Sequence, residues 1–505
     1  MASSKTGIDV HQLANDLTLI SNKYNGANIL ANTFLKLGKP TSENLLPYRR
    51  HNGKNNLLKI SISFLFFLPH LFAHVTREIV RAIYFRKENS LAIDELIPSG
   101  FLFVSHYTHS TLDYSKDSYF GAIPHELNSS TSKSSILLLN HTKEEAKLIF
   151  QEFEKNSCIP HYVNPKAFGM RELVMAIRNQ LPTSLRMIWG AIVDRKINSR
   201  QRLLLLDASI NQFSRSTFAA IILVKNLEKV LLRVQPRNVV LTFEGHSFEV
   251  LALKLIHDRF PRVRVLLYQY APIVKDQFGI VGTLRTLSPS DTVLVTGASV
   301  KDYFKRSVLS LENQIEILGS PKQQGRNIEG FTEFNMGDRL SVCLFAPEAS
   351  KEAFDELLQI AITCSKAMTS RRFIIRTHPA SDFDQNAISI IEGSFSSNMI
   401  LSRNSLVEDL QLSGFCVYRS SAVAIQGLAE GVRPIHFSST NGDGLDPLAI
   451  TALKHETITK ASQLISYLKS IDEGGKSTLI PSLAEMRKAY DDYFQPLNPQ
   501  ILKDF

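Results

Sequence analysis

Cysteine is scarce in this sequence, and no two cysteines are spaced as a CxxC pair. The 505 residues include four cysteines, which lie far apart along the chain at Cys158, Cys343, Cys364 and Cys416. Neither a zinc site nor a disulfide framework is expected from this distribution, and a reducing compartment is the default. Three of the four lie in apolar runs, where a free cysteine is typical of a small core residue.

Long apolar runs are also missing. The strongest extends from Ile60 to Thr76 and is uncharged for about 17 residues, which is the short limit for a helix that crosses a bilayer. It contains Pro69 and two histidines, so a transmembrane span is not expected. The run also comes late in the chain, and no small-residue cleavage site follows it, so no signal peptide is expected.

Negative charge is in the minority, because 57 Lys and Arg face 48 Asp and Glu for a net charge of +9. This excess favours an anionic partner. No RNP, zinc-finger or basic-zipper pattern is present, so nucleic acid is not expected among the partners. Basic residues gather instead between residues 49 and 87, around the apolar run. They favour a segment that lies against an anionic membrane surface, with a buried helix pair over the first sheet as an equally open alternative.

From Gly100 onward, predicted strands alternate with predicted helices, which favours an α/β fold with parallel, doubly wound sheets. A second α/β series begins at Thr292. We therefore expect two Rossmann-like domains that face a central cleft. The expected parts are an N-terminal helical extension (1–95), a first domain (96–288) with a helical insertion, a second domain (289–478) and a C-terminal helix that packs back across the cleft (479–505).

Two polar segments follow predicted strands of the second domain, Arg376-Thr377-His378-Pro379 and Arg419-Ser420-Ser421. Ligands of such sheets bind at the carboxyl ends of the strands. Ser420 and Ser421 can cap a helix that begins near Ala422, and its N-terminus would attract an anion. His378 can donate a hydrogen bond to a phosphate oxygen, while Arg376 or Arg419 can add charge. These segments predict a site for a nucleotide phosphate, although a plain helix cap and a plain turn would give the same pattern.

Gly319 and Ser320 follow another predicted strand. They can offer backbone amides to the nucleotide, and Lys322 can add charge. A simple turn is the alternative explanation for this segment.

The first domain has a carboxylate at a predicted strand end. Glu244 directly follows the strand at residues 239–243, and Gly245 lets the backbone turn tightly there. We predict Glu244 as the general base that accepts a proton from an acceptor hydroxyl, with His246 and Glu249 as alternatives. A helix N-terminus with acidic residues near its dipole would explain the same residues without catalysis.

A second polar patch in this domain contains His106 and His109. Both imidazoles can hydrogen-bond sugar hydroxyls, and we predict them, with His246, on the acceptor side. Metal ligation is the less favoured reading because Asp113 is the only acidic or cysteine partner close by in sequence. No metal is expected.

The pairing of RTHP at residues 376–379 with RSSAVAIQGLAEGVRPI at 419–435 resembles the C-terminal half of GT-B glycosyltransferases. It is most similar to the bacterial sialyltransferase, polysialyltransferase and Kdo-transferase group, which uses CMP-activated sugars. The resemblance implies that His378 and the Ser420-Ser421 pair contact the CMP phosphate. In the helix that follows this pair, enzymes that use UDP-sugars often have a glutamate that holds the ribose. This chain has Gln426 there and so departs from that pattern.

Two resemblances concern the first domain. Phe243-Glu244-Gly245 matches the last two positions of the D/E-D/E-G motif that holds the general base in the polysialyltransferase group. The patch after Ser105, with Tyr119-Phe120-Gly121 and Tyr268-Gln269-Tyr270, is similar to a family of bacterial surface-carbohydrate biosynthesis proteins. Together the resemblances span about residues 100–440.

These observations predict a GT-B-like glycosyltransferase that needs no metal and no cofactor beyond its donor. The expected reaction moves an ulosonic acid, a sialic-acid-like nonulosonate or Kdo, from a CMP-sugar to a surface polysaccharide or lipopolysaccharide. The expected place is the cytoplasmic face of a bacterial inner membrane. A glycerophosphotransferase that releases CMP from CDP-glycerol and a catalytically idle GT-B-like scaffold are the alternatives.

Overall fold

The computed structural model describes residues 69, 72–84, 98–107, 114–129, 133–142, 144–167, 169–274, 278–285, 287–308, 311, 314–323, 339–348, 350–378, 391–438, 446–474 and 480–505. His109 and most of the segment 49–87, both singled out in the sequence, lie outside these residues.

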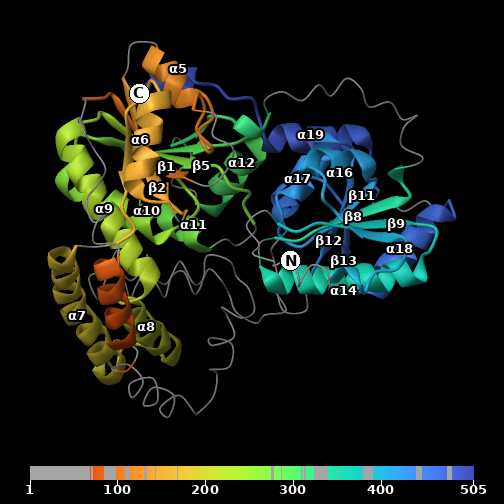
Figure 1. Cartoon of the computed structure of the whole chain (residues 1–505), viewed down its shortest axis with the longest axis horizontal. Helices are drawn as coiled ribbons and strands as arrows, with labels where there is room; N and C mark the ends of the chain where they lie inside the picture. Colours follow the sequence, from red (N-terminus) through yellow and green to blue (C-terminus); the bar gives the residue numbers. More distant parts are fainter. Residues whose placement is uncertain are drawn as a thin grey trace.

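The first sheet has seven parallel strands in the order β3-β2-β1-β4-β5-β6-β7 (Figure 1). Along the chain the strands are β1 (Phe101–Tyr107), β2 (Ser134–Asn140), β3 (His161–Asn164), β4 (Asn238–Thr242), β5 (Arg264–Gln269), β6 (Thr292–Val295) and β7 (Ile315–Ile317). The order runs outward in both directions from the β1–β4 pair, as in the Rossmann fold. The crevice at the carboxyl ends of β1 and β4 is therefore the expected ligand position in this sheet.

Both faces of the first sheet are covered, because successive side chains of each strand enter opposite cores. Leu102 and Val104 of β1 pack on one face with α9 (Arg215–Val234), α10 (Ser247–Arg259) and α11 (Phe278–Leu284). Phe101 and Phe103 pack on the other face with α5 (Ile123–Ser129) and α6 (Ala146–Asn156). Near-continuous apolar strands such as β1 are what a sheet buried on both faces requires.

The second sheet has six parallel strands in the order β10-β9-β8-β11-β12-β13. Its strands are β8 (Val342–Ala346), β9 (Arg372–Ile375), β10 (Met399–Leu401), β11 (Phe415–Tyr418), β12 (Arg433–Phe437) and β13 (Glu456–Ile458). The order reverses between β8 and β11, so this sheet repeats the Rossmann pattern of the first. One face packs on α14 (Lys351–Ala367) and α18 (Ala461–Asp472), and the other on α16 (Leu406–Leu412) and α17 (Val423–Ala429). The predicted α/β class with two Rossmann-like domains is confirmed.

The boundary predicted near residue 289 is wrong. β6 pairs with β5 and β7 pairs with β6, so both strands complete the first sheet. The first domain therefore extends to Ile317, and the second sheet begins at Val342. The strand–helix alternation does not show which sheet a strand joins, because a new series and the continuation of an old one give the same sequence pattern.

The C-terminal segment returns to the first domain. α19 (Leu483–Tyr493) contacts α17 of the second domain and α12 (Ala298–Ser307) of the first, and its buried Tyr490 and Tyr493 belong to the same core cluster as Val300 of α12. Beyond α19, Leu502 of α20 (Gln500–Lys503) enters the core that α5 and α6 cover. The end of the chain thus ties the two sheets together.

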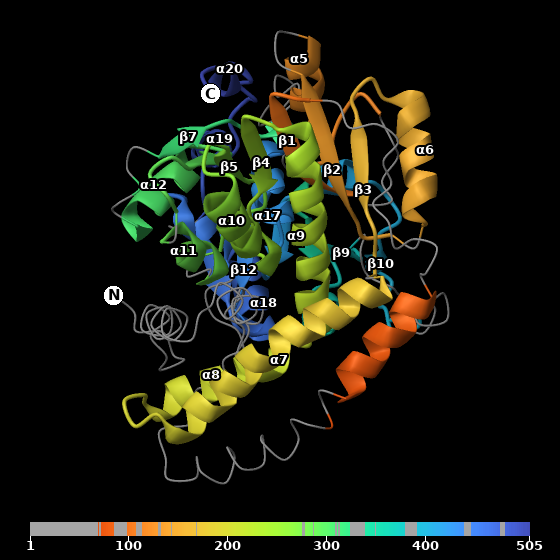
Figure 2. The ribbon, with the colours of Figure 1, turned by 90° about the vertical axis from the view of Figure 1, so that its left-hand side faces the viewer.

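Helices α7 (Met170–Val193) and α8 (Ser199–Asn211) form a hairpin that projects beyond the first sheet (Figures 1 and 2). The helical residues 72–84 lie beside it, with Ala82 packed in one cluster with Leu173 and Ala176 of α7. Within the described part of the chain, no helix has both the length and the hydropathy to cross a membrane.

Candidate functional site

The turn after β4 is held by a buried carboxylate. Glu249, in the first turn of α10, is fully buried. It accepts hydrogen bonds from three successive backbone N–H groups, those of Glu244 at 2.9 Å, Gly245 at 2.8 Å and His246 at 2.8 Å. Glu249, named from the sequence as an alternative base, therefore points into its own loop. Its role in the structure is to fix the backbone that carries Glu244 and His246.

Gly245 is required in this turn. Its φ of +82° lies in the left-handed region, and an added Cβ would lie 2.7 Å from the carbonyl carbon of Gly279 and 2.7 Å from the amide nitrogen of Ile280 in α11. Only glycine adopts this backbone and leaves room for α11. The close contact sets the position of the Glu244 turn at the carboxyl edge.

Glu244 and His246 form a polar pair at this edge. Nε2 of His246 lies 3.5 Å from a carboxylate oxygen of Glu244. The Glu244 side chain is 25% exposed and the His246 side chain 40% exposed. Burial alone would raise the pKa of the Glu244 carboxyl, but the hydrogen bond and charge of His246, aided by His106 and Lys322, hold this pKa below its usual range. Glu244 is thus an ionised carboxylate that reaches solvent beside an imidazole.

His106, on β1, lies next to this pair across the point where the strand order reverses. Its Nδ1 lies 2.7 Å from Nε2 of His141, and its Nε2 lies 3.0 Å from the Thr242 hydroxyl of β4. Burial, followed by the charge of His141, lowers the pKa of His106 to about 3. His106 is therefore a neutral imidazole at physiological pH, and its ring lies 6.4 Å from that of His246.

Lys322 brings a positive charge to the same edge. It lies on the 3-10 helix η3 (Pro321–Gln323) after β7, and its Nζ lies 4.3 Å from the ring centre of Tyr270 and 5.5 Å from that of Phe494. Burial lowers the pKa of Lys322 to about 8, although the charge of Glu244 opposes this shift. The ammonium is thus in contact with two aromatic rings, one from the residue that follows β5 and one from the C-terminal segment.

The structure contradicts the nucleotide contact expected of the Gly319 and Ser320 backbone amides. The Gly319 amide donates to the Val295 carbonyl at 3.1 Å, and the Ser320 amide donates to the Gln495 carbonyl at 2.8 Å. Ser320 is fully buried, and its hydroxyl accepts from the Lys322 amide at 3.2 Å. Both amides are therefore already hydrogen-bonded within the protein, one of them to the C-terminal segment that packs on this loop. They are not available to a nucleotide.

His378 and Ser420 lie at the same level of the second sheet's carboxyl edge. Ile375 of β9 and Val417 of β11 are both in register with Phe345 of β8. β9 and β11 flank β8, so they leave the sheet roughly 10 Å apart, and His378 and Ser420 each lie three residues beyond these register positions, after the strand has ended. Both predicted residues therefore follow strands at the carboxyl edge of this sheet, Ser420 at the switch point between β8 and β11 and His378 after β9, on the other side of β8.

The serine pair lies where the sequence predicted, just before a helix. The Ser421 hydroxyl accepts from the N–H of Val423, the first residue of α17, at 3.3 Å. The Ser420 Oγ is buried and has no hydrogen-bond partner among the described residues. One hydroxyl therefore caps the helix, and the other keeps its bonding capacity.

Both arginines of the predicted phosphate site are engaged within the chain. Arg376 pairs with the buried carboxylate of Asp409. Arg419 pairs with Glu348 at 2.6 Å and with Glu356 at 2.9 Å. The positive charge of Arg419 is thereby balanced by two carboxylates. Arg376 stays at the edge of the sheet beside His378, half-buried.

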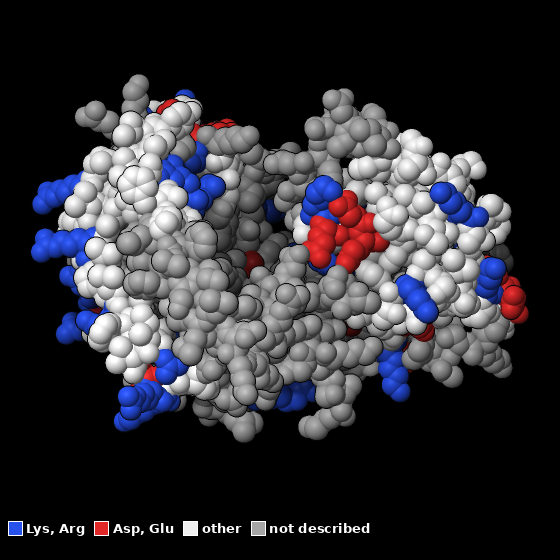
Figure 3. All heavy atoms as spheres, turned by 90° about the horizontal axis from the view of Figure 1, so that it is seen from below, with Lys and Arg blue, Asp and Glu red and all other residues white. Residues whose placement is uncertain are grey.

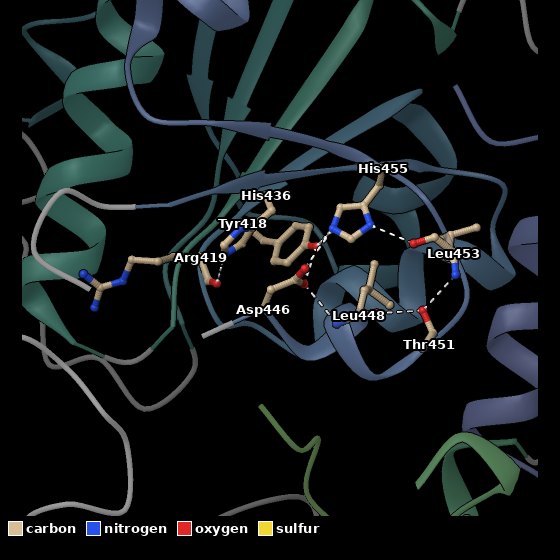
Figure 4. A network of polar contacts seen from close by, with 8 residues as sticks. All are labelled: Tyr418, Arg419, His436, Asp446, Leu448, Thr451, Leu453 and His455. Atoms are coloured by element: carbon tan, nitrogen blue, oxygen red, sulfur yellow. Dashed lines mark hydrogen bonds and ion pairs between the residues drawn. The ribbon is translucent and has the colours of Figure 1, made fainter. Parts of the chain in front are cut away.

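A buried polar network below this edge was not predicted from the sequence (Figure 4). The Tyr418 hydroxyl donates to Asp446 Oδ1 at 2.8 Å, and His455 Nε2 lies 2.9 Å from Asp446 Oδ2. Figure 4 shows the Arg419 side chain pointing away from this network, while its carbonyl lies 3.1 Å from His436 Nε2. The network joins the ends of β11 and β12 to the segment before β13. It was missed because Asp446 and His455 stand in loops without any recognisable motif.

His141 was also missed, although a signal for it existed. It directly follows β2, so the strand-end rule that selected Glu244 would have selected it too. No group of three or more His, Cys, Asp or Glu that could hold a metal ion occurs within the described residues.

No family model matches this chain, and no curated protein matches it. Solved structures do resemble it at low identity. UDP-GlcNAc 2-epimerase from Neisseria meningitidis, bound to UDP-GlcNAc, has a TM-score of 0.41 at 13% identity and covers 80% of this chain and 98% of its own. The glycosyltransferase of kitacinnamycin has a TM-score of 0.45 at 10% identity, over 81% and 98%. The glycosyltransferase SnogD from Streptomyces nogalater has a TM-score of 0.42 at 10% identity, over 81% and 100%.

Proposed function

We propose that this chain is a GT-B-type glycosyltransferase that moves a sugar from a nucleotide-activated donor to a hydroxyl acceptor. The observation that carries the proposal is the repeated Rossmann order, with a polar site at the switch point of each sheet. Ligands of such sheets bind at these points. One site supplies an ionised carboxylate beside imidazoles, and the other supplies hydrogen-bond donors at strand ends. Proton abstraction and phosphate binding are the two tasks of sugar transfer from a nucleotide.

In the proposed reaction, Glu244 accepts the proton of the acceptor hydroxyl as that oxygen attacks the anomeric carbon. His246 lies beside it and hydrogen-bonds the acceptor, and His109 is proposed for the same task. The acceptor contact expected of His106 is not proposed, because both of its ring nitrogens lie within hydrogen-bond distance of His141 and Thr242. The bond from the anomeric carbon to the donor phosphate breaks, and the nucleotide leaves with the electron pair. His378, Ser420 and Ser421 stabilise the departing phosphate electrostatically, with Arg376 beside them.

We further propose that the donor is a CMP-activated ulosonic acid. This rests on the resemblance of residues 376–379 and 419–435 to the CMP-sugar group. CMP leaves with a single phosphate, which a histidine and two hydroxyls can hold. The proposed acceptor is a bacterial surface polysaccharide or lipopolysaccharide. The proposed place is the cytoplasmic face of the inner membrane, with residues 49–87 against anionic lipid.

The test is a donor screen with the full chain. Thermal shift with CMP, CDP, UDP, GDP and ADP identifies the nucleotide, since a ligand that binds only the native state raises the melting temperature. Transfer is then measured with the matching activated sugar and with CDP-glycerol. Release of CMP with transfer of the ulosonic acid supports the proposal. Transfer of glycerol phosphate, or turnover with a UDP-sugar alone, would replace the proposed donor.

The Glu244→Gln variant separates catalysis from binding. We expect turnover to fall by about 10²- to 10⁴-fold, the usual contribution of a general base, while the melting-temperature shift with the nucleotide stays unchanged. The matched control is Glu154→Gln on the exposed side of α6, which should leave both unchanged. A wild type that binds a nucleotide but turns over no donor would instead make the chain a binding scaffold.

A further inference from the structure

Helix α7 has apolar side chains on both of its faces. On one face, Leu173, Ala176, Met187 and Ala191 are buried in the hairpin. Seven large apolar side chains of this helix are exposed, those of Met170, Val174, Met175, Leu185, Trp189, Ile192 and Val193. A surface helix of a globular protein is normally polar on its outer face. The exposed apolar residues of α7 therefore form a face that needs a partner.

The exposed residues form one stripe rather than scattered points. Met170, Val174, Leu185, Trp189 and Ile192 are separated by multiples of the helical repeat and so lie along one side of the helix. Trp189 is 67% exposed and Val174 60% exposed. At 24 residues, α7 is roughly 36 Å long. The stripe is thus a long, narrow surface that lies along the outside of the projecting hairpin.

The neighbouring helical residues 72–84 also expose large apolar side chains. Phe72 is 74% exposed, Ile83 61% and Tyr84 80%, while Val75 and Ile79 of the same helix pack toward α7. Two helices that pack on each other therefore both expose large apolar side chains to solvent. Such adjoining exposed patches mark interaction sites.

The charge on this surface is positive. Arg171, Arg178 and Arg186 are exposed on α7, and Glu172, its one acidic residue, pairs with Lys229 of α9 at 3.0 Å. Figure 3 shows basic side chains along the outer margin of this side of the molecule, with uncharged surface between them. Arginines interspersed with exposed apolar residues fit a surface that is apolar inside and anionic at its rim.

We propose that the exposed face of α7 is a membrane-docking surface that takes an anionic lipid bilayer. The helix lies in the plane of the headgroups, its apolar stripe enters the acyl boundary, and Trp189 sits at the interface, where indole rings are enriched. Arg171, Arg178 and Arg186 meet the headgroup phosphates. A second copy of the chain fits less well, because a twofold contact along this stripe would place these arginines near their own copies. This inference does not depend on the proposed reaction.

Trp189 reports on the docking directly, because it is the only tryptophan in the chain. The full chain is mixed with vesicles of phosphatidylcholine alone, or of phosphatidylcholine with phosphatidylglycerol. With the anionic vesicles we expect flotation, a blue shift of the Trp189 emission, and quenching by brominated acyl chains. Raising the salt concentration should weaken the binding. Flotation without any change in the emission would place the contact elsewhere and overturn the proposal, as would failure to bind anionic vesicles.

A double variant and its control test the stripe itself. Leu185→Glu with Ile192→Glu keeps Trp189 and should weaken vesicle binding more than about tenfold, because two carboxylates would enter the lipid interface. The matched control is Leu412→Glu on α16, where the leucine is 47% exposed, and it should bind like the wild type. Equal binding by all three proteins overturns the proposal. A blue-shifted emission that appears without lipid and grows with protein concentration overturns it in favour of self-association. If the double variant does not fold, the wild-type Trp189 measurements decide alone.

Discussion

The ammonium of Lys322 lies 4.3 Å from the centre of the Tyr270 ring. Tyr270 directly follows β5 and Lys322 follows β7, so two strand ends of the first sheet meet at this contact. The ring of Phe494, from the segment after α19, also contacts this ammonium. A charge that helps to keep Glu244 ionised is therefore held by residues from three distant parts of the chain.

The Lys322 contact predicts an alkaline limit to activity. The pKa of Lys322 is lowered to about 8, so the ammonium loses its proton as the pH rises through that value. The positive charge near Glu244 is then lost, and we expect kcat/KM to fall above this pH. Lys322→Arg keeps its charge at every accessible pH and should move this limb upward, whereas the control Lys469→Arg on α18 should not. A pH profile with the same alkaline limb in wild type and Lys322→Arg would contradict the assignment.

Because Glu249 positions the Glu244 turn and does not contact the substrate, its substitution should affect kcat and KM differently. Glu249→Gln leaves one acceptor oxygen for the three N–H groups that the carboxylate holds, and the new NH₂ group faces a donor. We expect the turn that carries Glu244 to loosen, so kcat falls while KM for the donor changes little, and stability falls by about 1 to 3 kcal/mol for the buried group left unpaired. Steady-state kinetics and urea unfolding measure the two effects.

The control for Glu249 is Glu485→Gln. Glu485 holds the start of α19 in the same way, by accepting from the Ser482 amide at 2.8 Å, but at an exposed position. Water replaces the lost bond there, so we expect little change in either measurement. If both variants behave alike, the buried triple hydrogen bond has no special part in holding the site.

Gly319 and Gly474 together test how the C-terminal segment packs on the first domain, because of the two only Gly319 contacts that segment. Both have positive φ, +88° and +73°, but an added Cβ at Gly319 would lie 2.1 Å from the Pro496 carbonyl oxygen, whereas at Gly474 nothing lies within 4 Å. Gly474→Ala should therefore cost only about 1 to 2 kcal/mol, from the left-handed backbone. Gly319→Ala should cost clearly more, because the segment after α19 must move away. Urea unfolding compares the two, and limited proteolysis should cut only Gly319→Ala near residue 495. Equal stability of the two variants would contradict the seating.

The sequence predicted the strands and the residues at their ends, because both depend on local pattern. The run of apolar residues before His378 and before Ser420 forms β9 and β11, and their common register with β8 places both residues at one edge. Glu244 was found by the same rule. The predicted positions agree with the structure because the carboxyl ends of parallel strands meet at one edge, whatever the order of the strands.

The predictions failed where the outcome depended on contacts between distant segments. Gly319 was interpreted as a phosphate loop, but its lack of a side chain makes room for Pro496. The same glycine pattern serves both purposes, and only the path of the C-terminal segment decides between them. Arg419 was expected to add charge for a phosphate, and its partners Glu348 and Glu356 lie more than 60 residues away in sequence. A local sequence pattern does not predict ion pairs between residues so far apart in the chain.

The buried pair of His455 and Asp446 predicts how stability depends on pH. Burial alone would lower the pKa of His455, but the hydrogen bond and charge of Asp446 outweigh this effect and raise it above 6.5. The pKa of Asp446 is lowered, because His455 and its hydrogen bonds outweigh the opposite effect of burial. A raised histidine pKa gives stability that is present below about 6.5 and is lost as the pH rises through the folded-state value. A lowered aspartate pKa gives stability that is present above about 3.9 and is lost as the pH falls through the folded-state value.

Both contributions are therefore present together between about pH 4 and pH 6.5. The difference in free energy of unfolding between wild type and His455→Gln should be largest in that window and should shrink toward alkaline pH. Thermal unfolding of both proteins across this range measures it. Asp446→Asn keeps one oxygen that can accept from Tyr418 and from the Leu448 amide, but it removes the charge that raises the pKa of His455, so it should remove the same pH-dependent part of the stability. Once Asp446→Asn is present, adding His455→Gln should produce no further pH-dependent loss, because the imidazole then has no carboxylate to pair with. A pH-independent difference for His455→Gln would mean that the imidazole acts here through packing and not through its charge.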